Sequence, residues 1–320
     1  MDPELFLEDL EAKPASLARL ADAFSAGDPL ADVPASPRRV ALLGMGSSRY
    51  AAVDSALAMR AAGLDAVAEY ASSTMGWPPA PDTLVVAISA GGESEETIAA
   101  VDRYRGRSPV VALTNAPRST IATLADVVVL LDAGEERGGV ASRTFQHTLV
   151  LLRALEARLG GRPVDVPAVC DRVANATSDL LDRRPSWLPE IASALDGRDG
   201  VDVLAPVGRN ASAEQGALIF REGPRRRSVA SETGDWSHVE VYLTKTLDYR
   251  ALLFAGSRWD GNALDWLRQR GSTLVSVGAT FREARASVRY PGDEDPEVAA
   301  LTEVLVPELV AGTWWAGTSI

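Results

Sequence analysis

Residues 84–97 have the sequence Leu-Val-Val-Ala-Ile-Ser-Ala-Gly-Gly-Glu-Ser-Glu-Glu-Thr, in which an apolar run ends at Ile88 and a loop rich in serine and glycine follows. A continuous apolar run of this length is typical of a strand buried on both faces of a parallel sheet. A helix candidate, Glu95–Tyr104, begins where the loop ends. Loops that precede a helix N-terminus expose backbone N–H groups and can bind anions. The stretch therefore predicts a strand, loop and helix of an α/β protein, with a candidate anion site in the loop.

The same order of strand, turn and helix occurs on both sides of this stretch. Further strands are predicted at residues 40–43, 66–70, 110–113, 127–131, 201–205, 251–254 and 273–277, and further helices at 51–62, 146–159 and 211–222. Gly46 and Gly208 occupy equivalent places in two strand–turn–helix units about 160 residues apart, which indicates an internal duplication. We expect two α/β units, each with three layers and a mostly parallel sheet flanked by helices. The predicted domains are an N-terminal helical segment (1–35), a first α/β domain (36–160), a helical bridge (161–198) and a second α/β domain (199–320).

The composition excludes several classes of protein. Of the 320 residues 46% are apolar and 24% are charged, and no apolar run approaches the roughly 20 residues that a membrane span needs. The net charge of −12 disfavours a nucleic-acid partner. The single cysteine, Cys170, cannot form a disulfide within the chain, and the acidic N-terminus lacks the layout of a signal peptide. We therefore expect a cytoplasmic protein with neither a nucleic-acid nor a membrane partner.

Two loops of the first half could bind a phosphate, namely residues 44–48 and 89–94. Both follow a predicted strand, so both should lie at the carboxyl edge of a parallel sheet, where ligands usually bind. Serine and glycine are also ordinary turn and N-cap residues, so one such loop alone would be a weak signal. Arg49 stands where a dinucleotide-binding loop has its third small residue, which disfavours a Rossmann dehydrogenase.

These loops resemble those of the SIS (sugar isomerase) family, which includes the isomerase portion of glucosamine-6-phosphate synthase and stand-alone phosphosugar isomerases, deaminases and deglycases. Residues 43–48 are similar to the first Gly/Ser loop of the family. Residues 86–97 resemble its I-S-x-S-G-x-T-x-x-T phosphate loop, with Gly91 for the second serine and Ser94 for the threonine. Residues 136–145 are similar to the segment that closes on the sugar. The resemblance, which extends from about residue 5 to 245, implies that the sugar phosphate is bound by Gly46, Ser47, Ser48, Ser89, Gly91, Gly92, Ser94, Thr97, Ala141 and Ser142.

The second half carries the residues that the resemblance makes catalytic. Residues 215–222 resemble the family helix that ends in a catalytic glutamate, here Glu222, and residues 234–238 stand in the place of the motif G-E-x-x-H, here ending in His238. The resemblance implies that Glu222 moves a proton between the carbons flanking the carbonyl and that His238, from a neighbouring subunit, opens the sugar ring. It therefore implies a homodimer with a shared site. Taken alone, a glutamate at a helix end is usually a solvated ion pair, and an isolated histidine is usually structural. His147, the only other histidine, is expected to be structural, and we expect neither a metal nor a redox cofactor.

The sequence departs from the family in ways that narrow the expected chemistry. Ile219 stands where the family helix has a lysine, and no lysine follows Lys245, so catalysis through an imine is disfavoured. The glutamine-hydrolysing domain is missing, so we expect no glutaminase activity. The predicted function is aldose–ketose isomerisation of a hexose 6-phosphate or deamination of an amino-hexose 6-phosphate. A fructosamine-phosphate deglycase and a catalytically silent sugar-phosphate sensor are the alternatives.

Overall fold

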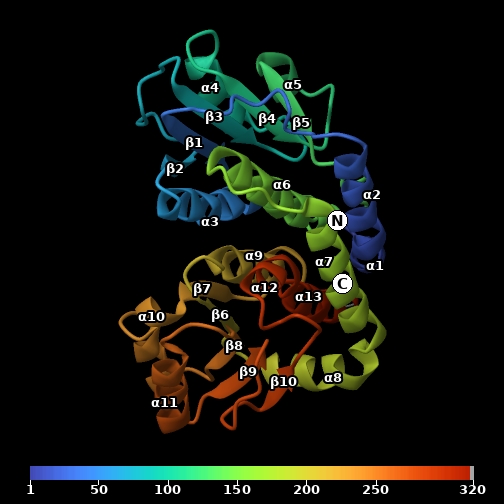
Figure 1. Cartoon of the computed structure of the whole chain (residues 1–320). Coiled ribbons are helices and arrows are strands. Elements are labelled where there is room, and N and C mark those ends of the chain that lie inside the picture. Colours follow the sequence, from blue (N-terminus) through green and yellow to red (C-terminus); the bar gives the residue numbers. More distant parts are fainter. Residues whose placement is uncertain (318–320) are drawn as a thin grey trace. The chain divides into compact units, whose positions relative to one another are not determined.

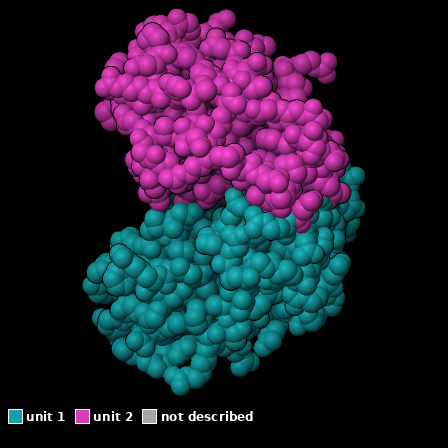
Figure 2. All heavy atoms as spheres, in the orientation of Figure 1, with its two compact units in different colours: residues 1–14, 136–142, 172–320 teal, residues 15–135, 143–171 magenta. Residues whose placement is uncertain are grey.

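The computed structural model describes residues 1–317, so the last three residues of the predicted second domain lie outside the described residues. The chain divides into two compact units, coloured separately in Figure 2. Unit 1 contains residues 1–14, 136–142 and 172–320, and unit 2 contains residues 15–135 and 143–171. The domain boundaries predicted above stay predictions. No helix of the described part of the chain is both long and apolar enough to cross a membrane.

Unit 2 is built around a parallel five-stranded sheet in the order β2-β1-β3-β4-β5 (Figure 1). Its strands are β1 (Arg39–Gly44), β2 (Asp65–Tyr70), β3 (Thr83–Ile88), β4 (Val110–Thr114) and β5 (Val127–Leu130). All residues of β3 and β4 are buried, as the continuous apolar runs predict. The helices are α2 (Lys13–Ala26), α3 (Ser47–Ala61), α4 (Glu95–Tyr104), α5 (Thr120–Leu124), α6 (Arg143–Leu159) and the first part of α7 (Val166–Asp182).

The strand order of unit 2 creates a switch point between β1 and β3. These strands are neighbours, with Leu43 paired to Ala87, but the chain continues from β1 to β2 on one side and from β3 to β4 on the other. Because such crossovers are right-handed, α3 and α4 cover opposite faces of the sheet, as Figure 1 shows. The two helix N-termini therefore lie at the carboxyl edge of β1 and β3, which is where open α/β sheets bind ligands.

Unit 1 repeats this topology with a parallel sheet in the order β10-β9-β8-β6-β7. Its strands are β6 (Val201–Ala205), β7 (Ser228–Glu232), β8 (Arg250–Phe254), β9 (Thr273–Val277) and β10 (Ala286–Val288). Its helices are α1 (Pro3–Glu11), the end of α7, α8 (Arg184–Leu195), α9 (Asn210–Glu222), α10 (Thr233–Trp236), the 3₁₀ helix η1 (Glu240–Lys245), α11 (Asp260–Arg270), α12 (Pro296–Thr302) and α13 (Leu305–Gly317). The two similar parallel sheets confirm the predicted fold class.

The two faces of the unit 1 sheet pack against different helices. Val203 and Leu252 lie in one apolar cluster with Phe220 of α9 and Leu309 of α13. Alternate residues of the same strands, such as Leu204, lie in a second cluster with residues of α10, η1 and α11. Since neighbouring side chains of a strand point to opposite faces, α9 and α10 lie on opposite sides of this sheet.

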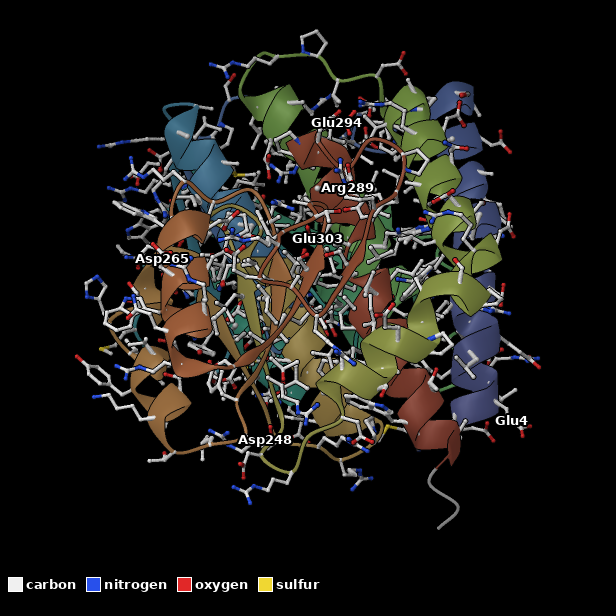
Figure 3. All side chains as sticks on the ribbon, turned by 90° about the horizontal axis from the view of Figure 1, so that it is seen from below. Glu4, Asp248, Asp265, Arg289, Glu294 and Glu303 are labelled. Atoms are coloured by element: carbon white, nitrogen blue, oxygen red, sulfur yellow. The ribbon has the colours of Figure 1, made fainter. Side chains whose placement is uncertain are left out.

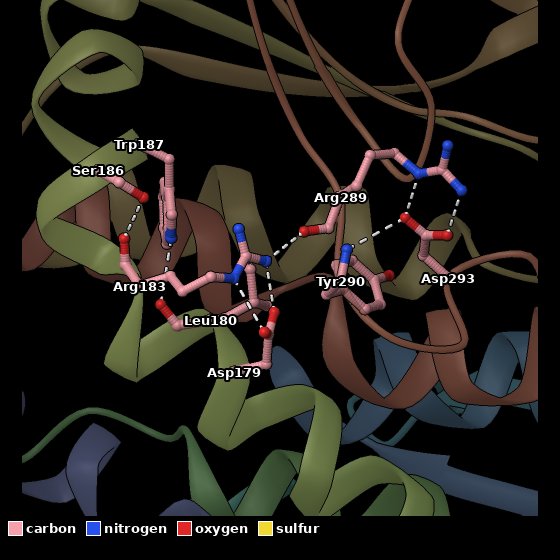
Figure 4. A network of polar contacts seen from close by, with 8 residues as sticks. All are labelled: Asp179, Leu180, Arg183, Ser186, Trp187, Arg289, Tyr290 and Asp293. Atoms are coloured by element: carbon pink, nitrogen blue, oxygen red, sulfur yellow. Dashed lines mark hydrogen bonds and ion pairs between the residues drawn. The ribbon is translucent and has the colours of Figure 1, made fainter.

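Polar contacts tie the irregular parts of unit 1 to its core. Arg183 pairs with Asp179 and donates to the carbonyl of Arg289, which itself pairs with Asp293 (Figure 4). This network joins the corner between α7 and α8 to the segment that follows β10.

Three of the differences from the sequence prediction concern the start of one helix and two strands that were not predicted. The helix predicted at 51–62 begins at Ser47, so Ser47 and Ser48 lie in its first turn and not in a loop. β7 and β10 were not predicted, because the first has the polar sequence Ser-Val-Ala-Ser-Glu and the second has only three residues. Both are edge strands, which lack the continuous apolar pattern of the central ones.

Candidate functional site

The loop between β1 and α3 leaves a helix N-terminus without a side-chain cap. Gly46 is the N-cap residue, with a positive φ of 51° that glycine adopts readily, and no side chain accepts a hydrogen bond from the first turn of α3. Ser47 and Ser48 are both half-buried in that first turn. The turn therefore presents N–H groups that no side chain caps, the positive end of the helix dipole and two hydroxyl groups.

The loop between β3 and α4 is held in shape by its own hydrogen bonds. The Ser89 hydroxyl accepts a bond of 3.1 Å from the N–H of Gly92. Gly92 has a positive φ of 69°, and a Cβ atom there would lie 2.0 Å from the Ser119 hydroxyl, so only glycine fits. Gly91 is exposed at the tip of the loop. The loop is thus a rigid backbone cradle whose tip is open to solvent.

Ser94 and Thr97 act together at the start of α4. Ser94 is the N-cap residue and accepts hydrogen bonds from the N–H (3.3 Å) and the hydroxyl (3.1 Å) of Thr97. The Ser94 hydroxyl itself donates to the carboxylate of Glu96 at 2.9 Å. Thr97 is buried, and its hydroxyl supports Ser94.

Two residues that the sequence did not single out brace the cradle. Glu93 accepts hydrogen bonds from the N–H (2.8 Å) and the hydroxyl (2.6 Å) of Thr120, and these bonds hold the pKa of Glu93 below its ordinary value. Asn115 donates to the Gly134 carbonyl and accepts from the N–H of Ala133. These contacts join segments that are far apart in the sequence, so no local pattern could have indicated them.

The segment 136–142 leaves unit 2 and packs on α1 and α9 of unit 1. The Glu136 carboxylate accepts hydrogen bonds from the N–H (2.6 Å) and the hydroxyl (3.3 Å) of Ser142. The side chain of Gln215 in α9 donates to the carbonyl of Ala141 at 2.9 Å. Ala141 and Ser142 are therefore held against the helix that ends in Glu222.

Glu222 is the last residue of α9 and is half-buried. Burial raises the pKa of its carboxyl above the ordinary value, and the neighbouring charge of Arg221 only partly offsets this effect. Gln215 lies seven residues earlier on the same face of the helix, about 10 Å along its axis. Ile219, in the place of the family lysine, is buried in the core.

His238 does not lie near Glu222 within one chain. It is exposed in the turn after α10, where its N–H donates to the carbonyl of Asp235 at 2.8 Å. Since α9 and α10 cover opposite faces of the unit 1 sheet, the sheet separates the two residues. Of the predicted residues, the structure thus gathers those of 46–48 and 89–97 at one edge of unit 2, places Ala141, Ser142 and Glu222 on the α9 side of unit 1, and leaves His238 on the other side.

Both lysines and the remaining histidine have structural surroundings. The Lys13 amine is completely buried 2.5 Å from the Glu308 carboxylate, whereas Lys245 is exposed beside the ring of Tyr242. His147 is buried in unit 2, where Nδ1 donates to the Leu131 carbonyl and Nε2 accepts from Ser16. Burial lowers the pKa of His147 to about 4, so the ring is neutral near pH 7.

The sequence is similar to known proteins over much of its length. Residues 35–157 match the family model of the SIS domain. Among curated proteins, the chain is similar to the isomerizing glutamine--fructose-6-phosphate aminotransferase of Aeropyrum pernix, with 26% identity over 299 residues, covering 86% of this chain and 47% of the relative. The corresponding protein of Halobacterium salinarum is 29% identical over 238 residues, covering 68% of this chain and 39% of the relative. The chain therefore spans less than half the length of these relatives.

Solved structures share the fold over nearly the whole chain. The C-terminal domain of the glucosamine-fructose-6-phosphate aminotransferase from Francisella tularensis has a TM-score of 0.84 and 17% identity, covering 98% of this chain and 95% of that one. The glucosamine-6-phosphate deaminase of Thermotoga maritima has a TM-score of 0.76 and 15% identity, covering 99% and 96%. The tagatose-6-phosphate ketose/aldose isomerase of Escherichia coli has a TM-score of 0.77 and 14% identity, covering 98% and 93%.

The fold and the two loops define an α/β protein with a candidate ligand site at the switch point of a parallel sheet. Residues 35–157 match a SIS domain, and the chain shares its fold with the tagatose-6-phosphate ketose/aldose isomerase of Escherichia coli. The family resemblance inferred from the sequence is thus confirmed.

Proposed function

We propose that the chain binds a hexose or amino-hexose 6-phosphate and moves a proton between C1 and C2 of the sugar, which isomerises an aldose to a ketose or deaminates an amino sugar. The observation that carries this proposal is the pair of serine- and glycine-rich loops at the switch point of unit 2, beside the uncapped N-terminus of α3. The SIS domain and its phosphosugar-isomerase fold support it.

The phosphate would be bound by the two loops together. The first turn of α3 supplies N–H groups and the hydroxyls of Ser47 and Ser48, and a helix N-terminus stabilises a nearby anion by about 0.3–1 kcal/mol. The second loop adds Ser89, Ser94 and the exposed backbone at Gly91. Thr97 keeps Ser94 oriented, and the segment at Ala141 and Ser142 would close on the sugar.

Glu222 would carry the proton. A carboxyl whose pKa is raised toward neutrality can take a proton from one carbon and return it to the next, through an enediol or enolamine intermediate. His238 would open the ring of the sugar, and because the unit 1 sheet separates it from Glu222, it would do so in a second copy of the chain. The proposed assembly is therefore a homodimer whose sites are shared between subunits.

The test is proton NMR in D₂O with fructose 6-phosphate and, separately, with glucosamine 6-phosphate. We expect deuterium to enter at C1 or C2 in the native protein, with ammonium released from the amino sugar if the reaction is a deamination. The variant Glu222→Gln should bind the same sugar but lose exchange by a factor of about 100 or more. Exchange that persists in Glu222→Gln would contradict the role of Glu222. If neither sugar bound to the protein, the proposed phosphate site would be wrong.

A sugar-phosphate sensor is the second candidate function, since Gly91 lacks the family hydroxyl and Ile219 is buried where the family lysine would be. A sensor would bind the sugar phosphate without any exchange, and Glu222→Gln would leave its affinity unchanged. A fructosamine-phosphate deglycase would use the same proton transfer and release an amino acid in place of ammonium. Imine chemistry through Lys13 is not part of the proposal, because the Lys13 amine is buried in an ion pair.

A further inference from the structure

Three buried side chains connect the turn that carries His238 to the sheet of unit 1. The indole N–H of Trp236, at the end of α10, donates to the Tyr249 hydroxyl at 2.7 Å, and the two rings lie 6.1 Å apart. The Tyr249 hydroxyl lies beside the carboxylate of Asp202, and burial together with this neighbouring charge raises the pKa of Tyr249. All three residues are at least 95% buried.

The lower end of this network is fixed in the centre of the sheet. Asp202 lies in β6, and Tyr249 immediately precedes β8, the strand that pairs with β6 through Asp202 and Ala251. Asp202 lies between Val201 and Val203 of the α9 face, so its carboxylate points into the opposite layer, which contains Trp236 and Leu204. A carboxylate in an apolar layer is costly unless it accepts hydrogen bonds, so an apolar residue would fill this place with less loss of stability.

The upper end of the network is the turn itself. Glu232 caps α10 by accepting from the N–H groups of Gly234 and Asp235, both at 2.9 Å. On the other side of Trp236, the N–H of His238 donates to Asp235 and the Ser237 hydroxyl donates to Gly234. Trp236 is thus the large side chain by which this four-residue helix is attached to the core, and His238 follows it by two residues.

We propose that Trp236, Tyr249 and Asp202 are positioning residues for His238, which hold its exposed ring in the orientation needed to open a sugar. This inference rests on the proposed function, in which His238 opens the sugar ring. It assigns an indirect role in ring opening to three buried residues, which would act through the orientation of His238. Loss of the Tyr249 hydroxyl leaves the indole N–H without its acceptor inside the core, and α10 with the turn that carries His238 then moves to satisfy it.

Ring opening can be measured apart from proton transfer. In a Glu222→Gln background isomerisation should be at least about 100-fold slower. The protein-dependent rate at which the α and β anomers of glucose 6-phosphate interconvert then reports on ring opening. Exchange NMR measures this rate. Adding His238→Ala to this background should remove the acceleration, and adding Tyr249→Phe or Trp236→Phe should lower it about 10- to 100-fold, the cost of a displacement of roughly 1 Å in a catalytic group.

The controls separate positioning from general loss of structure. Tyr242→Phe removes a tyrosine hydroxyl from the exposed part of the same segment and should change nothing. Asp202→Asn keeps a polar side chain of the same size beside Tyr249 and should keep the rate, whereas Asp202→Leu should match Tyr249→Phe. Binding of the sugar phosphate and thermal unfolding are measured for every variant. If Tyr249→Phe does not fold, Asp202→Leu and Trp236→Phe test the same role.

The outcomes distinguish the positioning role of Trp236, Tyr249 and Asp202 from the role of His238 in ring opening. If His238→Ala removes the acceleration but Tyr249→Phe, Trp236→Phe and Asp202→Leu retain it, the positioning role is wrong and the proposed function stands. If His238→Ala itself has no effect while the sugar still binds, the role of His238 in the proposed function is wrong, and the positioning role is wrong with it.

Discussion

At the scale of single residues, His147 shows how burial turns a titratable group into a structural one. In a neutral imidazole one nitrogen carries the proton, and the Leu131 carbonyl, which can only accept, assigns that proton to Nδ1. Nε2 must then accept the hydrogen bond of 2.9 Å from Ser16. Uptake of a second proton would break this bond and place a charge in the core of unit 2.

This arrangement predicts an acid-sensitive stability. The pKa of His147 is about 4 in the folded protein and 6.5 in the unfolded chain, so the unfolded chain binds more protons between these values. Stability should therefore fall as the pH falls from about 6.5 to about 4, by at most roughly 3 kcal/mol. Urea unfolding midpoints at pH 7, 5.5 and 4.5 measure the effect.

The matched variant is His147→Gln, which cannot titrate. It should be less stable than the native protein at pH 7 but should lose less stability on acidification. Buried carboxyls with raised pKa values, such as Glu308 and Asp202, change stability in the opposite direction over part of this range, so the difference between the two proteins is the quantity to compare. An equal fall in both proteins would show that His147 is not the group responsible.

At the scale of elements, the carboxyl edges of the two sheets differ in what fills the switch point. In unit 2 the two loops of the candidate phosphate site lie at the carboxyl edge of β1 and β3. In unit 1 the equivalent place between β6 and β8 is occupied by Arg209, which pairs with buried Glu303 and donates to the carbonyl of Ala255 (Glu303 is labelled in Figure 3). One switch point thus carries the candidate site, and the other is occupied by a buried ion pair.

Removal of one partner of this pair should destabilise unit 1. Glu303→Ala leaves the buried guanidinium of Arg209 without its ion-pair partner, at a cost of about 3–5 kcal/mol. The double variant Arg209→Met with Glu303→Leu should be close to the native protein in stability, because both charges are replaced by apolar groups. Thermal unfolding measures both. Sugar-phosphate affinity should stay unchanged in the double variant, and a loss of affinity there would place the phosphate in unit 1.

The elements also show what a sequence can reveal about such a fold. The central strands were predictable because they are buried on both faces and have continuous apolar runs, as β3 does. β7 was not, because an edge strand of sequence Ser-Val-Ala-Ser-Glu has no such pattern. The loops of the candidate site were predictable from local composition. The contacts that brace them, such as Glu93 with Thr120, and the network below His238 join distant segments and exist only in the folded chain.

At the scale of the whole molecule, the unit 1 sheet lies between the two residues that we propose to be catalytic, Glu222 and His238. Glu222 ends the helix on one face of this sheet, and His238 follows the short helix on the other face. If both act on one sugar, each site must take Glu222 from one copy and His238 from another. A twofold dimer meets this condition with two identical sites.

This arrangement predicts complementation between two inactive variants. Glu222→Gln and His238→Ala should each be inactive alone. A heterodimer of the two has one site in which both residues are native and one in which neither is. After subunits exchange at random, half of the dimers are heterodimers, so activity should return to about a quarter of the native value. Differently tagged subunits verify that exchange has occurred, and isomerisation or ammonium release reports the activity. No recovery in mixed dimers would mean that the two residues do not meet across subunits, and the shared-site proposal would then be wrong.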